Sequence, residues 1–243
     1  MKIIINADDF GLDEIRTKTI EDYINRGLIS SATIMANGEC LEEAFRFAKE
    51  HPEISFGIHL CLTEYGSITK SAVFKKYGIT DDNGIFVKKA ILKIKKLPRD
   101  LEVAVKEELC AQIKKIQDSG LTISHADSHH HVHTYPQIYK IVIDVLKEYK
   151  LRKVRIAAEF PLLRKIRRFN RWVKFCKIQH SLKKKFVTTE YFMSLGDYKA
   201  ATYKDSIELM CHPGHPNQKY VDEMQLIEDG LFDNIKLSTY YEL

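Results

Sequence analysis

The chain has 243 residues, of which 44% are hydrophobic and 29% charged, so it can bury the core of one α/β domain spanning residues 1–243. No stretch approaches the ~20 apolar residues of a membrane span, and no signal peptide is visible, which argues against a membrane-spanning or secreted protein. The five cysteines are scattered without a CxxC pair, as is typical of reduced thiols. We therefore expect a cytoplasmic protein.

Positive charge is concentrated in one segment. The formal net charge is +5, yet residues 162–185 contain ten Lys or Arg and no acid. Apolar residues recur there at helical spacing, among them Leu162, Ile166, Val173 and Cys176. This pattern predicts a basic amphipathic helical insertion. The first interpretation is a helix that packs on the domain, and the second is a helix that docks on the inner face of an anionic membrane. A nucleic-acid contact ranks last, because no known nucleic-acid recognition motif accompanies the charge.

The first sixty residues alternate between apolar runs and helical spacing. A β-branched run predicts a strand at Lys2–Asn6, and helical periodicity predicts a helix at Asp13–Arg26. A second strand and helix follow at Ser31–Met35 and Leu41–Glu50. A third strand, Ser55–Leu60, ends this part of the chain.

The rest of the chain continues the alternation after an irregular stretch. Residues Glu64–Pro98 show little periodicity, and loops of that length often form lids or substrate walls. The expected later elements, in chain order, are a helix at Asp100–Ser119, a strand at Leu121–Ala126, a helix at Pro136–Tyr149, and strands at Lys153–Ile156 and Ile207–Cys211.

Alternating strands and helices predict a parallel sheet or a βα barrel. Polar candidates follow the expected strands: Asp8 and Asp9 the first, His59 the third, and His129, Arg155 and His212 the later ones. Barrel enzymes build their active sites where the carboxyl ends of strands converge, so we expect these side chains to meet.

Five of the ten histidines lie within the nine residues His125–His133. Histidine is a middling core residue and a poor strand former, so this density indicates a metal or proton-transfer site rather than packing. An extended backbone would place His130 on one side and the other four histidines on the opposite side. The roles of His125, His130, His131 and His133 stay open.

A hydrolytic metal site needs about three protein ligands and an open position for water. One carboxylate and two imidazoles, drawn from Asp9, His59 and His129, meet that need. Asp8 could then serve as general base, provided that the strand breaks into a turn, because adjacent residues on a strand point to opposite faces. Asp127 is a candidate partner that fixes the tautomer of a ligand.

Four sequence blocks resemble the YdjC/ChbG-like carbohydrate deacetylases (chitooligosaccharide deacetylase-like), which are similar in mechanism to polysaccharide deacetylases. The blocks are NADDFG at Asn6–Gly11, GIHLCLT at Gly57–Thr63, HADSHHHVHTYP at His125–Pro136 and MCHP at Met210–Pro213. The resemblance covers most of the chain, but not the middle loops or the basic segment. It implies a deformed (β/α) barrel of the polysaccharide-deacetylase-like type.

The resemblance also implies an activity, the hydrolysis of an N-acetyl group on an amino sugar with release of acetate. Carried over by motif, Asp9, His59 and His129 would bind one divalent metal ion, and Asp8 would be the general base. His212 would be the general acid, and Arg155 would hold the base ionised and oriented. Two imidazoles favour Zn, whereas the family is associated with Mg, so both ions stay open.

Two other functions remain as alternatives. The same Asp/His set could serve another metal-dependent amidohydrolase or a phosphoesterase, or the chain could be an inactive glycan-binding protein. The expected partners are an N-acetylated amino sugar, whether an N-acetylglucosamine oligosaccharide or a lipid-linked glycan, a membrane surface at residues 162–185, and a second copy of the chain as a homodimer. Nucleic acid is not expected as a partner.

Overall fold

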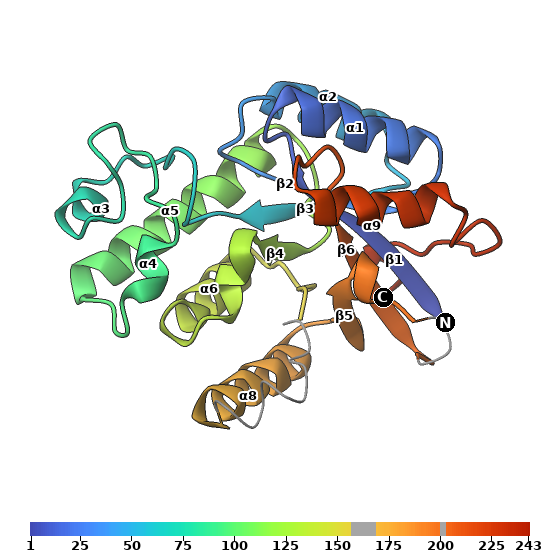
Figure 1. The fold of residues 1–243 in the computed structure, drawn as a ribbon. Helices are drawn as coiled ribbons and strands as arrows, with labels where there is room; N and C mark the ends of the chain where they lie inside the picture. The colour runs from blue at the N-terminus through green and yellow to red at the C-terminus, as the bar shows by residue number, and fades with distance from the viewer. Residues whose placement is uncertain (157–168, 200–202) are drawn as a thin grey trace.

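Six parallel strands form one curled sheet in the order β4-β3-β2-β1-β6-β5 (Figure 1). This computed structural model describes residues 1–156, 169–199 and 203–243. The strands are β1 Lys2–Phe10, β2 Ser31–Ile34, β3 Ser55–Leu60, β4 Ala126–Ser128, β5 Tyr191–Ser194 and β6 Ser206–Cys211.

Helices surround the sheet. In Figure 1, α1, α2 and α9 lie above it, and α5, α6 and α8 lie below it and to the left. The helices are α1 Glu14–Asn25, α2 Leu41–Glu50, α3 Ala72–Lys76, α4 Ala90–Lys93, α5 Arg99–Asp118, α6 Pro136–Glu148, α8 Phe169–Lys185 and α9 Gln218–Glu228. The 3-10 helices are η1 His129–Thr134, η2 Leu195–Asp197 and η4 Tyr240–Glu242.

Short bridges carry the sheet beyond β4 and toward β5. Val154 pairs in parallel with Ala126 of β4, and Lys153 pairs in parallel with Val187. The chain from Val187 leads directly into β5, so the sheet bends round toward its other edge. This arrangement confirms the predicted deformed barrel. The strand expected at Lys153–Ile156 was wrong, because only two of its residues form bridges.

The apolar core explains why β1 lies at the centre of the sheet. Ile3, Ile4 and Ile5 are all buried, as expected for a parallel strand that is covered on both faces. The strand expected at Leu121–Ala126 was placed too early, because β4 begins only at Ala126. The last two residues of β4, Asp127 and Ser128, are polar although they are buried, so apolar periodicity could not locate this strand.

The described part of the basic segment forms α8, which packs on the barrel through α6 and η1. Ile178 and Leu182 are buried, whereas Lys177 and Lys184 are exposed. All of the predicted apolar and arginine positions between residues 162 and 172 lie outside the residues whose side chains are described. Among the described helices, none is long and apolar enough to cross a membrane.

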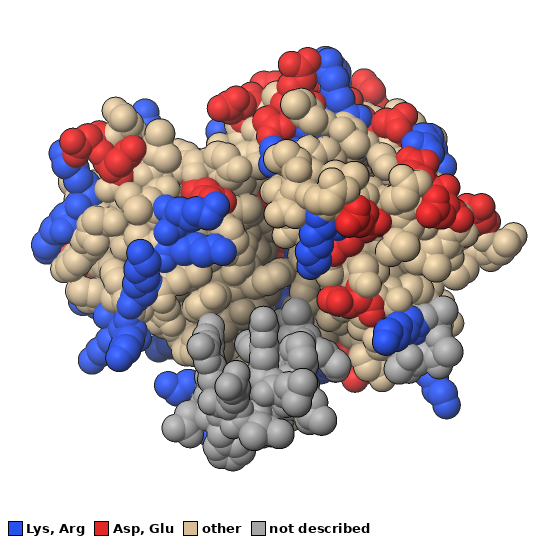
Figure 2. Space-filling model, in the orientation of Figure 1, with Lys and Arg blue, Asp and Glu red and all other residues tan. Residues whose placement is uncertain are grey.

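Some elements were not expected. The stretch Glu64–Pro98 holds the short helices α3 and α4, and the chain after the basic segment adds β5 and α9. Figure 2 shows Lys and Arg side chains gathered on the side of the visible face that α4, α5 and α6 occupy. Lys95, Lys96 and Arg99 contribute to a groove on that side. Basic charge is therefore not confined to the segment that the sequence singles out.

Candidate active site

A kink at the end of β1 brings two neighbouring aspartates to the same side. Asp9 adopts left-handed backbone geometry, with φ of 66°, and the pairing of β1 with β2 changes register between Ala7 and Phe10. In a regular strand, Asp8 and Asp9 would point to opposite faces. The break required for both to reach one centre therefore lies at Asp9 itself, and both carboxylates are buried.

Asp9, His59 and His129 converge although they come from three separate segments. Asp9 Oδ1 lies 3.3 Å from His59 Nε2 and 3.1 Å from His129 Nδ1. One ligand atom from each residue lies within 4.8 Å of the other two. A carboxylate and two imidazoles at this spacing can hold one divalent cation and leave positions open for water. These are the three residues that the sequence predicted as ligands.

Each of the two histidines is oriented by a carboxylate on its other ring nitrogen. Asp127 Oδ1 lies 2.7 Å from His59 Nδ1, and Glu64 Oε2 lies 2.9 Å from His129 Nε2. Thr33 donates to Asp127 at 3.1 Å and adds a contact to the His59 ring. Such partners fix the tautomer that leaves the inner nitrogen free to ligate. The donor set therefore fits a metal ion.

The charges around the two ligands are strongly coupled. Burial lowers the pKa of His59, but the charges of the Asp127 and Asp8 carboxylates raise it by more than burial lowers it, so that the pKa is about 9. Burial raises the pKa of Asp9, but the hydrogen bond and charge of His129 bring it well below its usual range. In the metal-free protein, an ionised aspartate thus faces a protonated imidazole, and a cation would replace the His59 proton.

Asp8 is held ionised beside this centre. Arg155 donates to its carboxylate through two nitrogens, at 2.8 and 2.6 Å, and Asn6 donates to it at 3.0 Å. Burial raises the pKa of Asp8, but the Arg155 guanidinium lowers it more, to well below its usual range. Asp8 is therefore a carboxylate at neutral pH and can accept a proton.

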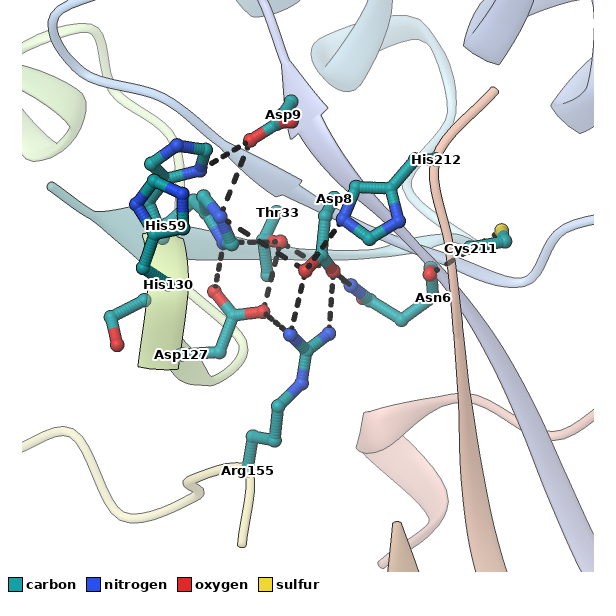
Figure 3. A network of polar contacts seen from close by, with 12 residues as sticks. Asn6, Asp8, Asp9, Thr33, His59, Asp127, His130, Arg155, Cys211 and His212 are labelled. Carbon is teal, nitrogen blue, oxygen red and sulfur yellow. Dashed lines mark hydrogen bonds and ion pairs between the residues drawn. The ribbon is translucent and has the colours of Figure 1, made fainter. Parts of the chain in front are cut away.

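His212 follows β6 and faces Asp8 from the opposite side to Arg155 (Figure 3). Its Nε2 atom lies 3.8 Å from Asp8 Oδ2, and its ring packs on Tyr220 with ring centroids 4.2 Å apart. Burial lowers the pKa of His212 despite the nearby aspartates, so the metal-free site holds a neutral imidazole at pH 7. The ring can accept a proton from its surroundings and pass it on.

The remaining cluster histidines divide into two groups. His130 and His131 have φ of 52° and 54°, which ends the extended backbone, and both line the site cavity. His125 and His133 are instead buried in the interior, at 0% and 1% exposure. The expected alternation of sides was therefore wrong, because η1 turns the chain directly after β4.

The site opens into a cavity of about 280 Å³. The six residues predicted for the site all meet at this cavity or directly below it, where the Arg155 side chain is fully buried. The other cavity walls come from the loop after β3 and from the chain after β6, including Tyr65, Lys88, His215 and Tyr220. The long irregular stretch thus supplies part of the cavity wall.

Sequence reasoning missed several polar residues of this region. Asn6, Thr33 and Glu64 contact the site directly, and Glu208 and Tyr240 contact Arg155 or its partners. Most are single polar residues without a motif. Glu208 was the exception, because an acid in the middle of the apolar run of β6 is an unusual signal.

A deformed barrel with a candidate metal centre at the carboxyl ends of its strands defines the class of protein. The chain matches the family described as YdjC-like protein over residues 2–238, and it belongs to this family. The resemblance predicted from the four sequence blocks is thereby confirmed.

Known relatives and a solved structure agree with this assignment. A carbohydrate deacetylase of Vibrio parahaemolyticus is 32% identical over 230 residues, which cover 91% of this chain and 81% of the relative. A carbohydrate deacetylase of Brevibacillus brevis is 37% identical over 163 residues, which cover 67% of this chain but only 60% of the relative. A crystal structure from Enterococcus faecalis, described as a candidate cellobiose-phosphate cleavage protein, superposes with a TM-score of 0.75 at 22% identity. It covers 99% of this chain and 98% of its own and thus shows the same fold.

Proposed function

We propose that the protein is a metal-dependent carbohydrate deacetylase, which hydrolyses the N-acetyl group of an amino sugar and releases acetate. The observation that supports this most directly is the pairing of a three-ligand centre with a separate ionised aspartate, Asp8, beside it. Relatives named carbohydrate deacetylase supply the substrate class.

The ligands in this proposal are Asp9, His59 and His129, and their spacing and oriented tautomers fit one divalent cation. When bound, the cation supplies a Lewis acid that polarises the acetamide carbonyl and makes water more acidic. Two imidazoles favour Zn, and the carboxylate is compatible with Mg as well.

Asp8 acts as the general base that removes a proton from the attacking water. Its two oxygens are held by Arg155, which leaves the carboxylate fixed in orientation and negatively charged. A base that is held in position increases the rate because no conformational entropy has to be lost to orient it in each turnover.

His212 acts as the general acid that protonates the leaving amine of the sugar. The path for the proton is short, because His212 Nε2 lies 3.8 Å from Asp8 Oδ2. The neutral ring can therefore take up the proton that Asp8 removes from water and donate it to the nitrogen as the amide bond breaks.

Acetate release from N-acetylglucosamine oligomers tests the proposal. We expect turnover by the purified protein, its loss after treatment with a chelator, and its recovery on addition of Zn²⁺ or Mg²⁺. The two cations, added separately, decide which is used. Acetate release that chelation leaves unchanged would exclude the metal, and the absence of acetate release from oligomeric and lipid-linked substrates alike would exclude the activity.

The proposal also covers location and assembly. The protein is one cytoplasmic domain over residues 1–243 and forms a homodimer. Its helix α8 contacts the inner face of the membrane. Lys174, Lys177 and Lys184 are exposed on α8, which supports contact with an anionic surface. Sedimentation with anionic vesicles at low salt tests the membrane contact, and a protein that stays in the supernatant contradicts it. Light scattering tests the dimer.

A further inference from the structure

A fully buried guanidinium, that of Arg155, lies under the candidate active site and contacts three carboxylates. Arg155 Nη1 contacts Asp8 at 2.8 Å and Asp127 at 2.6 Å, and Nη2 contacts Asp8 at 2.6 Å. The opposite edge, Nε and Nη2, meets Glu208 Oε1 at 2.7 Å in both cases. Three of these contacts are hydrogen bonds, one each from Nε, Nη1 and Nη2, and the contacts of Nη1 with Asp127 and of Nη2 with Glu208 are ion pairs. Rotation of the guanidinium would therefore break several of them together.

Among the described residues, three carboxylates contact Arg155, and Glu208 lies farther from the proposed metal centre than Asp8 and Asp127 do. Glu208 is fully buried in the middle of β6. Its hydrogen-bond partners are Arg155 and Tyr240, and it does not line the described cavity. A buried carboxylate needs hydrogen bonds on both oxygens to offset its desolvation. Oε1 has Arg155, and Oε2 accepts the hydroxyl hydrogen bond of Tyr240.

Tyr240 is itself fixed on all sides. Its ring stacks on His125 with centroids 3.6 Å apart and an interplanar angle of 6°, and its side chain is fully buried. Its backbone N–H donates to Ser55 Oγ at 3.1 Å, and a capping box of Thr239 and Glu242 closes the turn of η4. The packing of the ring and the hydrogen bonds of the backbone thus fix the position of the Tyr240 hydroxyl.

We propose that Tyr240 and Glu208 are positioning residues for deacetylation, which hold the Arg155 guanidinium in the plane where it grips both oxygens of Asp8. Neither residue lines the site cavity or belongs to the proposed ligand set. Each acts through Arg155, so that the C-terminal turn orients the base from the far side of the cluster. His125 supports this arrangement as the flat surface beneath Tyr240. The inference rests on the proposed function, because Asp8 is the base only there.

Tyr240→Phe removes the hydroxyl and leaves the stack on His125 in place. We expect kcat to fall roughly 10-fold, the scale for loss of an outer partner of a catalytic group, with KM and zinc affinity unchanged. Tyr241→Phe is the matched control, because this neighbouring ring is 47% exposed, and we expect wild-type kinetics from it. A Tyr240→Phe enzyme with wild-type kcat would overturn the proposal, whatever its melting temperature.

A double-mutant cycle separates positioning from general stability. Glu208→Gln keeps an oxygen for Arg155 but loses the charge that pairs with it, and we expect a kcat decrease similar to that of Tyr240→Phe. Because both residues act through one guanidinium, the double variant should be no slower than Glu208→Gln alone within about twofold. Independent, multiplicative losses would show that Tyr240 does not act through Glu208 and would overturn the proposal.

A measurement without substrate keeps this inference separate from the proposed activity. The Arg155 Nε–H resonance, assigned by its absence in Arg155→Lys, should exchange slowly with water in the wild-type protein and in Tyr241→Phe. In Tyr240→Phe it should shift and exchange faster. If the wild-type protein releases no acetate, the proposed function fails and this resonance alone decides whether Tyr240 orders Arg155. An unmoved, equally protected resonance would overturn the inference.

Discussion

Asp127→Asn should weaken metal binding because it changes which nitrogen of the proposed ligand His59 carries the proton. Asp127 holds His59 Nδ1 at 2.7 Å with one oxygen and Arg155 Nη1 at 2.6 Å with the other. An asparagine amide has a single oxygen, so it can accept from one of these donors only. If it keeps Arg155, its N–H faces His59 Nδ1, and the imidazole proton must move to Nε2, the nitrogen that faces Asp9.

The expected loss is about 10- to 100-fold in zinc affinity, the range for an outer partner of a ligating histidine. This corresponds to about 1.4–2.7 kcal/mol of binding free energy. Competition with a chromophoric chelator at pH 7 measures it. Asp144→Asn, an exposed aspartate on α6, is the control and should bind zinc like the wild type. An Asp127→Asn protein with wild-type zinc affinity would refute the argument from the His59 tautomer.

Four further outcomes follow from the structure. Asp8→Asn should lower kcat by about 10²- to 10⁴-fold while zinc stays bound, and His59→Ala should lose the metal; full activity in either variant contradicts the roles proposed here. Glu64→Gln should weaken zinc binding by roughly 10-fold, as titration with the same chelator would show. Burial lowers the pKa of His125 and His133 well below its usual value, so the unfolded chain binds more protons below about pH 6.5. The free energy of unfolding of the metal-free protein should therefore fall between pH 6.5 and 5.5, by up to about 1.4 kcal/mol per pH unit for each ring, and constant stability in urea titrations over that interval would contradict this.

Apolar periodicity predicted elements well where most of the buried residues are apolar. The strand Ser55–Leu60 and the helix Leu41–Glu50 were predicted with the bounds that the structure has. The method failed where the last residues of a strand are polar. Ala126–Ser128 has no apolar alternation, and Asp8 and Asp9 hid the last residues of β1.

The candidate site was predictable to the extent that it is made of histidines and paired aspartates. Asp9, His59 and His129 are recognisable because their residue types suggest ligands and each follows or ends a strand. Thr33 and Tyr240 gave no such signal, since one hydroxyl side chain in a strand or near a turn is not distinctive in a sequence. Their partners lie far away along the chain, and only the closed barrel brings them together.

Two neighbouring aspartates can face one site only where the backbone departs from a regular strand, as the left-handed residue Asp9 does here. In the proposed mechanism one carboxylate binds the cation and the other accepts a proton from water, and both can reach one centre because a single distorted residue breaks the two-residue repeat of β1. A designer who copied the Asp-Asp pair into a regular strand of another scaffold would keep the sequence and lose the chemistry, since one side chain would turn outward. The portable unit is the bulged strand together with its neighbour, and not the dipeptide.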